Sequence, residues 1–321
     1  LIDSCEVTVE ADQLSTAIET EWRDNYVFDT PELRALLEPH TDVKFLSATA
    51  LNNFVTYESG CANSLHFPEK QIVRLPTAPT IQTEFGTIVH AMFEEIVNRM
   101  AANGEAAIES IEAEYRQQIS WLDFAPEDVH RYSERFERIC QAFVPWLVEH
   151  VHGYRCVTEA NMQCLTAGGT PLFGFLDLLL VDDAAKTVQI VDYKTGFGKE
   201  VPAGYHRQLK FYKLLVEASP EFCGYIVTSM GDYYVEPDKT TGELRPPFST
   251  TATADDIAEL EQLIDAVWAR IEHGAWDTSA FEQSNVYELA IEEQKSCRKK
   301  ADKTEVMQRA YERWLVENPG M

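Results

Sequence analysis

The chain has 321 residues, of which 45% are hydrophobic and 11% are aromatic. That supply of apolar side chains is enough to bury a large core, in one big domain or two small ones. Acidic residues outnumber basic ones by 53 to 27, which gives a net charge of −26. Proteins that bind nucleic acid usually present a basic surface, because neutralising phosphates drives the non-specific part of binding. Composition alone therefore argues against nucleic acid as a ligand, unless metal ions or a local basic patch reverse the charge where it matters.

The sequence shows no sign of a membrane or secreted protein. No stretch approaches the roughly 18 to 20 uninterrupted apolar residues that a membrane helix needs, and the N-terminus lacks the basic and apolar regions of a signal peptide. The seven cysteines are scattered without a C-x-x-C pair, so we expect reduced thiols in a cytoplasmic protein. Because the first residue is not Met, we also expect a domain taken from a longer protein.

The first half of the chain is predicted to be helical. An N-terminal extension or linker over residues 1–45 holds a short helix at 31–37, and Ser47 then begins an apolar helix. Three further helices are predicted from apolar residues at helical spacing: about 81–100, 105–119 and 127–150. We therefore expect an all-helical part from about 46 to 153, at the start of a domain that runs from 46 to 321.

After Gly153 the periodicity changes to that of strands. Predicted strands occupy 155–165, 172–181, 187–194, 223–229 and 232–236. Helices are predicted at 203–218, 254–272 and 283–316, the last two after a break at Pro246 and Pro247. A sheet core at about 154–236, followed by C-terminal helices at about 254–317, predicts an α/β fold. We expect a central mixed β-sheet flanked by helices, with an N-terminal helical region.

The strand at 187–194 ends in the residues with the clearest chemical meaning. Asp192 and Lys194 stand two apart, so both side chains project from one face of the strand. Hydrolysis of a phosphodiester needs a hard cation held by carboxylates and a group that positions or activates water, and Asp-x-Lys can supply both. The pattern is common by chance, and we interpret the similar runs Asp42-Val43-Lys44 and Glu293-Gln294-Lys295 as surface charges.

Asp177 distinguishes Asp192 from these other matches. It is the one acid in an apolar strand, and burying a lone carboxylate is costly unless it is paired or bound to metal. Folding the strands about the turn at 182–186 brings position 177 opposite 191 or 192. Two carboxylates would repel each other there, and a divalent cation would resolve that conflict. A half-exposed acid at a strand end is the alternative.

Two helical pairs accompany these acids. His90 and Glu94 lie on one face of a predicted helix, and Gln208 and Tyr212 lie on one face of the helix after the Asp-x-Lys strand. Each pair alone is explained equally well by core packing. The run Gly196-Phe197-Gly198-Lys199 lacks the spacing and the Ser/Thr of a P-loop, so we expect no nucleotide-driven motor in this chain.

Four blocks in chain order resemble the motifs of the RecB-type nuclease family, within the PD-(D/E)XK superfamily. They are G-T-x-x-H at 86–90, G-x-x-D at 174–177, D-Y-K-T-G at 192–196 and Q-x-x-x-Y at 208–212. This family includes the nuclease domains of RecBCD- and AddAB-type helicase–nucleases and the CRISPR-associated RecB-like nucleases. The stretch at 46–51 also resembles the family's opening serine–leucine helix. The resemblance spans about residues 46 to 213 and implies a restriction-endonuclease-like core.

The resemblance implies roles for individual residues. His90, Asp177 and Asp192 would be metal ligands, together with the backbone carbonyl of Tyr193. Lys194 would orient or polarise the attacking water and stabilise the charge that develops on the phosphate.

Four further residues have smaller implied roles. Gln208 and Tyr212 would organise the site or the substrate strand. Glu94 would be a partner of His90 that does not itself bind the metal. Glu159, on the strand before the one that carries Asp177, is a weaker candidate ligand, and a solvated strand position explains it equally well.

The cysteines and the basic residues give two more expectations. Many relatives bind an iron–sulfur cluster through one early cysteine and three C-terminal ones, and here Cys61 matches the first but Cys297 stands alone. Since four thiolates are needed, we expect no iron–sulfur cluster. A strip of cations is expected to hold DNA, and a further basic run is expected either to join it or to be a solvated helix face. The strip is Lys199, Arg207, Lys210 and Lys213, and the run is Arg298, Lys299 and Lys300.

The sequence thus predicts a Mg²⁺- or Mn²⁺-dependent deoxyribonuclease, an exonuclease rather than an endonuclease. It would act in DNA repair or recombination, on single strands supplied by a UvrD/AddA-like helicase that is fused to it or bound as a subunit. The rival interpretation is a catalytically silent nuclease-like domain that guides DNA or scaffolds a helicase complex, marked by loss of the acidic or lysine positions. A metal-binding α/β domain unrelated to nucleic acid is a third, favoured only by the acidity.

Overall fold

The computed structural model describes residues 44–58, 67, 70–71, 79–196 and 203–272. The chain divides into two compact units, of which the second, Lys44–Asn52 with Pro76–Ala269, contains the sheet. The first unit comprises Leu1–Val43, Asn53–Leu75 and Arg270–Met321. The predicted helices at 31–37 and 283–316, and all but the last two residues of the predicted extension at 1–45, lie outside the described residues.

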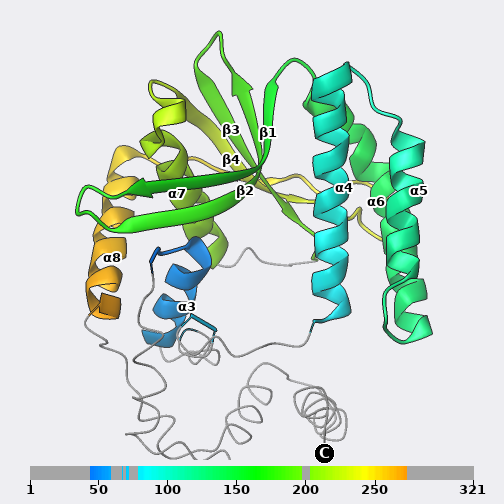
Figure 1. Cartoon of the computed structure of the whole chain (residues 1–321), viewed down its shortest axis with the longest axis horizontal. Helices are drawn as coiled ribbons and strands as arrows, with labels where there is room; N and C mark the ends of the chain where they lie inside the picture. The colour runs from blue at the N-terminus through cyan, green and yellow to red at the C-terminus, as the bar shows by residue number, and fades with distance from the viewer. Residues whose placement is uncertain (1–43, 59–66, 68–69, 72–78, 197–202, 273–321) are drawn as a thin grey trace, which may run out of the picture. The chain divides into compact units, whose positions relative to one another are not determined.

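Five strands form one mixed sheet in the order β1-β2-β3-β4-β5 (Figure 1). They are β1 (Arg155–Leu165), β2 (Pro171–Asp182), β3 (Thr187–Lys194), β4 (Ile226–Tyr234) and β5 (Phe248–Thr250). Neighbouring strands are antiparallel except β3 and β4, which are parallel. The helix α7 (Ala203–Ala218) makes the crossover that parallel neighbours require. The predicted α/β fold, a mixed sheet flanked by helices, is confirmed.

Three long helices precede the sheet and pack against one another. They are α4 (Ile81–Asn103), α5 (Ile108–Ser120) and α6 (Pro126–His150). Thr80 caps the start of α4, and Gly104, with a φ of 77°, ends it. The buried faces of these helices form one apolar core with the sheet, to which Val191 and Tyr193 of β3 contribute. The predicted N-terminal helical region is therefore present and packs on the sheet.

Two further α-helices lie in the described structure, α3 (Ala48–Glu58) and α8 (Ala254–Glu272). Figure 1 shows α4, α5 and α6 grouped to one side of the strands and α7 and α8 to the other. The hydroxyl of Ser47 accepts a hydrogen bond from the backbone N–H of Ala50 at 3.1 Å, so Ser47 caps α3 as predicted. None of the helices in the described ranges is both long and apolar enough to span a membrane.

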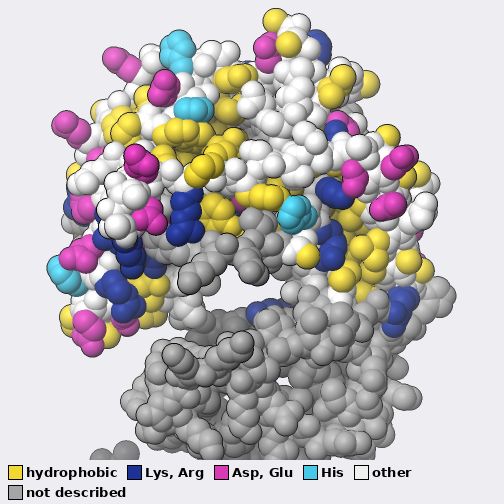
Figure 2. Space-filling model, turned by 180° about the vertical axis from the view of Figure 1, so that it is seen from behind, with side chains coloured by type: hydrophobic (Ala, Val, Ile, Leu, Met, Phe, Trp, Pro, Cys, Tyr) yellow, Lys and Arg dark blue, Asp and Glu magenta, His cyan; other side chains and the backbone are white. Residues whose placement is uncertain are grey.

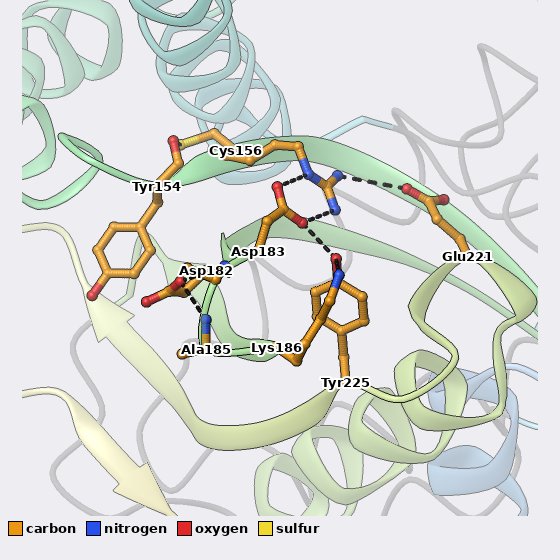
Figure 3. Close-up of polar contacts among 10 residues, drawn as sticks. Tyr154, Cys156, Asp182, Asp183, Ala185, Lys186, Glu221 and Tyr225 are labelled. Atoms are coloured by element: carbon orange, nitrogen blue, oxygen red, sulfur yellow. Dashed lines mark hydrogen bonds and ion pairs between the residues drawn. The ribbon is translucent and has the colours of Figure 1, made fainter.

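The turn between β2 and β3 is fastened by side chains (Figure 3). The Asp182 carboxylate accepts hydrogen bonds from two backbone N–H groups of the turn, at 2.9 Å each. Asp183 accepts a hydrogen bond from the Tyr225 hydroxyl at 2.5 Å and pairs with Arg155 at 2.9 Å. A fixed turn fixes the antiparallel register of β2 and β3, and that register decides which residues meet at the other end of the hairpin.

One predicted pair of strands is wrong. Residues 223–229 and 232–236 do not form two strands, because a single continuous strand, β4, covers Ile226–Tyr234. Gly231 lies inside this strand, where a Cβ atom would come within 3.2 Å of the carbonyl oxygen of Phe248. The glycine therefore allows β5, a strand that the sequence did not predict, to approach the edge of the sheet.

The hairpin of β1 and β2 is distorted at one point. The register is the same on both sides of Glu159, yet Glu159 itself has a φ of 44°, a left-handed conformation that non-glycine residues rarely adopt. Beyond this point, the buried residues of β2 face a different helix. Leu178 belongs to the core formed with α4, α5 and α6, whereas Gly174 packs against Leu215 of α7. At Glu159 and at the residue opposite it, Asp177, the helices that cover this face of the strand pair therefore change from α4, α5 and α6 to α7.

Gly174 gives a test of this packing. A Cβ atom there would lie 2.7 Å from Cδ1 of Leu215, which is itself fully buried. We expect Gly174→Val to lower the free energy of unfolding by about 1–3 kcal/mol, because the core between β2 and α7 must repack. Urea denaturation measures the change.

Leu215→Ala provides the control, since it removes the atoms with which the new side chain collides. The effects of the two substitutions should then be non-additive in a double-mutant cycle. An unchanged denaturation midpoint for Gly174→Val, or strict additivity, would contradict the packing described.

Candidate active site

Neighbouring parallel strands bring two acids side by side. Asp192 of β3 pairs in register with Asp232 of β4, so both carboxylates project from the same face of the sheet. Asp192 is only 3% exposed, and Asp232 is 0% exposed. The sequence predicted Asp192 as a site residue but missed Asp232, because a local pattern does not reveal which strands pair in parallel.

The Asp232 carboxylate lies against the ammonium of Lys194, with 3.7 Å between Oδ1 and Nζ. No donor in the described part of the chain forms a hydrogen bond with either carboxylate oxygen of Asp232. Burial raises the pKa of the Asp232 carboxyl, and the charge of Lys194 opposes that rise. A buried acid so incompletely paired lowers stability, so its presence is better explained by function than by folding.

Lys194 is held from several sides. Its ammonium forms an ion pair with Asp192 and lies 4.5 Å from the ring centroid of Tyr205. Burial lowers the pKa of Lys194, but the charges of Asp192 and Asp232 outweigh that effect, and the pKa is raised. The side chain therefore keeps its positive charge at neutral pH although only 16% of it is exposed.

The two residues predicted on α7 reach this lysine. The Lys194 ammonium donates a hydrogen bond to Oε1 of Gln208 at 3.2 Å, and Nε2 of Gln208 donates one to the Tyr212 hydroxyl at 2.7 Å. Burial raises the pKa of Tyr212 far above its ordinary value, so its hydroxyl stays protonated. Lys194, Gln208 and Tyr212 thus form one chain of hydrogen bonds between β3 and α7.

Asp177 connects β2 to the end of β3. The pairing of β2 with β3 ends at Leu178 and Val191, and Asp177 and Asp192 are the residues next to this last pair. Oδ2 of Asp177 accepts a hydrogen bond from the backbone N–H of Tyr193 at 2.7 Å. The fixed hairpin therefore holds the Asp177 carboxylate at the place where the Asp-x-Lys strand ends.

His90, Glu159 and Asp177 converge on one point. They come from α4, β1 and β2, and each offers a ligand atom within 4.8 Å of the other two. Nδ1 of His90 lies 3.4 Å from Oδ1 of Asp177. Burial lowers the pKa of His90, but the hydrogen bond to Asp177 and the nearby acids outweigh that effect and raise it. One imidazole nitrogen with two carboxylates is a donor set that suits a divalent cation such as Mg²⁺ or Mn²⁺.

The predicted ligands are thus only partly brought together. His90 and Asp177 belong to the three-donor group, but the carboxylate of Asp192 is turned toward Lys194 and lies outside it. Burial and the charge of Asp177 raise the pKa of Asp192, while Lys194 opposes the rise. Glu159, the weaker candidate from the sequence, lies inside the group. The sequence does not predict the left-handed backbone conformation of Glu159.

The three donors open into a cleft of about 700 Å³ between α4 and the sheet. Its walls include Thr87 and Glu94 of α4 and Thr195, which follows β3. Glu94 was expected to be the partner of His90, and the partner that the structure gives is Asp177. Gly86 of α4 lies close to the end of β3, since a Cβ atom there would lie 3.4 Å from the Thr195 hydroxyl.

The three described residues of the predicted DNA-binding strip on α7 form contacts within the protein. Lys210 pairs with Asp256 at 2.6 Å, and Lys213 is buried and pairs with Glu217. The guanidinium of Arg207 donates a hydrogen bond to Asn52 at 2.6 Å, and burial lowers its pKa. These cations are used within the protein. Lys199 and the basic run at 298–300 lie outside the described residues.

The four described cysteines are free thiols: Cys140, Cys156, Cys164 and Cys223. Cys61 and Cys297 lie outside the described residues, so the expectation of no iron–sulfur cluster remains a prediction.

The family model of the PD-(D/E)XK nuclease superfamily matches residues 46–299 of the chain, which span every element described above. No curated protein matches the chain. A crystal structure of a candidate exonuclease from Eubacterium rectale is similar at 12% identity and a TM-score of 0.43, over 78% of this chain and 88% of that one. The crystal structure of SSO0001 is similar at 13% identity and a TM-score of 0.33, over 74% of this chain and 83% of that one. By the family match over most of its length, the chain belongs to the PD-(D/E)XK nuclease superfamily.

Proposed function

We propose that the protein hydrolyses the phosphodiester bonds of DNA with the help of a divalent metal ion. One observation carries the proposal: a charged, largely buried lysine lies beside a group of three metal donors, at the end of one strand pair. Lys194 is fixed by Asp192 and Gln208, and the donors His90, Glu159 and Asp177 line the adjoining cleft. Membership of the nuclease superfamily supports the interpretation of this arrangement as a site for phosphodiester hydrolysis.

The proposed ligands are His90, Asp177, Asp192 and the backbone carbonyl of Tyr193, and we add Glu159 to them. Mg²⁺ or Mn²⁺ bound there would supply positive charge for the phosphate and make water a better nucleophile. The carboxylates need such an ion, because several acids in one cleft repel one another. Divalent ions are also the general cofactors of this superfamily.

Lys194 is proposed to stabilise the negative charge that develops on the phosphate and to orient the attacking water. That role requires the ammonium to be in place before the substrate arrives, because preorganised charges cost no rearrangement during the reaction. Gln208 and Tyr212 hold it from α7. Asp232 is proposed as a positioning residue, which holds the ammonium from β4.

The finer parts of the proposal rest on the order and spacing of the four sequence blocks. They support a RecB-type exonuclease that degrades single-stranded DNA during repair or recombination. A UvrD/AddA-like helicase, fused or bound as a subunit, would supply the strand. The rival candidate, a silent domain that only guides DNA, is disfavoured because Asp177, Asp192 and Lys194 are all present.

Cleavage of labelled single-stranded DNA with and without Mg²⁺ tests the proposed function. The purified protein should cut only with the metal, and Asp192→Asn or Lys194→Met should slow cleavage by about 100-fold or more, because both groups act in the transition state. Lys295→Met is the matched control, since Glu293-Gln294-Lys295 has the same short pattern. Binding of DNA without cleavage under any metal would favour the silent domain.

The role of Glu159 can be measured without cleavage. Glu159→Gln should weaken Mn²⁺ binding, measured by calorimetry, by roughly 10-fold or more, because a charged oxygen ligand is replaced by a neutral amide. Glu94→Gln is the matched control, since Glu94 lines the same cleft but lies outside the three-donor group. Equal affinity losses in the two variants would remove Glu159 from the ligand set.

Asp232→Asn separates a positioning role from a structural one. The change keeps the shape of the side chain and removes its charge, so we expect kcat to fall by roughly 10-fold with little change in KM, and the unfolding temperature not to fall. Asp255→Asn, an exposed acid at the start of α8, is the control. A wild-type kcat in Asp232→Asn would exclude the positioning role.

A further inference from the structure

A second cavity, of about 400 Å³, adjoins the catalytic cleft. Gln82 at the start of α4 lines both spaces. Thr195 lines the cleft, and the next residue, Gly196, lines the second cavity. A bound DNA strand that leaves the catalytic cleft past the end of β3 would therefore enter this cavity directly.

The second cavity is basic, although the chain as a whole is not. Four of its lining residues are cations, Arg131, Arg135, Arg138 and Lys239, and one, Glu134, is an acid. The whole chain has a net charge of −26, so this local excess is exceptional. Figure 2, seen from behind the view of Figure 1, shows Lys and Arg side chains at the left and at the right of that face, among Asp and Glu side chains.

The three arginines form a row on one face of α6, because their spacings of four and three residues match the helical period. The middle one, Arg135, is used within the protein. It pairs with the buried Glu236 and donates a hydrogen bond to the backbone carbonyl of Thr195 at 2.8 Å. Arg135 thus fixes the chain where the two spaces meet, and it leaves ligand binding to its neighbours on the helix.

Arg131 and Arg138 have donors to offer. Arg131 is 60% exposed, and its partner Asp128 is a surface acid one turn away, so a ligand can replace that weak pair at little cost. The Nε–H of Arg138 is buried and has no acceptor in the described structure. An unsatisfied buried donor is costly, so contacts within the described structure leave the guanidinium of Arg138, a lining residue of the cavity, incompletely paired.

We propose that this cavity, the arginine pocket, binds the phosphate backbone of the DNA strand next to the bond that is cleaved. Guanidinium groups suit phosphate because their planar donors bind two oxygens at once. The contacts would carry no sequence information, and they would set the position of the strand relative to Lys194. The inference rests on the proposed nuclease function and names the surface that holds its substrate.

The test is DNA affinity against salt concentration, with Ca²⁺ in place of Mg²⁺ to suppress cleavage. Arg131→Gln and Arg138→Gln should each raise the Kd for a single-stranded oligonucleotide by roughly 3- to 10-fold. Each should also reduce the slope of log K against log salt by about 0.7, the value of one lost phosphate contact on a single strand. A merely structural role would leave that slope unchanged.

Arg99→Gln is the matched control. Arg99 is also a half-exposed helical arginine that pairs with an acid one turn away, Glu95, but it lies on α4 outside the arginine pocket. It should leave both the Kd and the slope unchanged. Arg131 is exposed, so Arg131→Gln keeps the test valid even if Arg138→Gln folds poorly.

Two results would overturn the inference: a double variant with the wild-type Kd and slope, or a wild-type protein that binds no DNA in Ca²⁺. If the wild-type protein cuts DNA with Mg²⁺ in the first case, the proposed function survives and the arginine pocket does not. If the variants lose affinity and slope as expected but the wild-type protein never cuts, the pocket survives and the nuclease activity does not.

Discussion

A lysine ammonium beside two buried carboxylates is the interaction on which this structure depends. Asp192 and Asp232 stand in register on adjacent parallel strands, where both side chains are buried and like charges repel. Lys194 makes that arrangement tolerable, and α7 supplies the neutral groups that keep the lysine there. The crossover helix therefore does two things at once. It makes the parallel pairing possible and it completes the polar cluster that the pairing creates.

Acidic and basic side chains line two separate but neighbouring spaces in this protein. The acids that suit a cation face one cleft, and the arginines of α6 face the cavity beside it. A left-handed residue costs roughly 1–3 kcal/mol, and Glu159 adopts that conformation where its carboxylate meets His90 and Asp177. Such strain is typical of a site whose geometry is held by its surroundings. An overall charge of −26 is thus compatible with binding a polyanion.

Much of the fold could be predicted from sequence, because it follows from local periodicity. The helices α4 to α7 and the strands β1 to β3 have strong patterns, and the turn residue Asp182 fixes one register. What could not be predicted depends on contacts distant in the chain. Asp232 reaches the site only because β4 pairs in parallel with β3, and Lys210 forms an ion pair with Asp256 on a later helix. The contribution of Glu159 depends on a backbone conformation that its residue type does not favour.

The parallel pairing of β3 with β4 has a consequence for how the protein is made. Asp192 and Asp232 are separated in sequence by the whole of α7, so the contact that completes the polar cluster is non-local. Contacts of this kind form late in folding, because a long loop must close first. A growing chain released only as far as β3 would hold Asp177, Asp192 and Lys194 without the strand and helix that position them. The polar cluster can therefore be complete only when synthesis has passed β4.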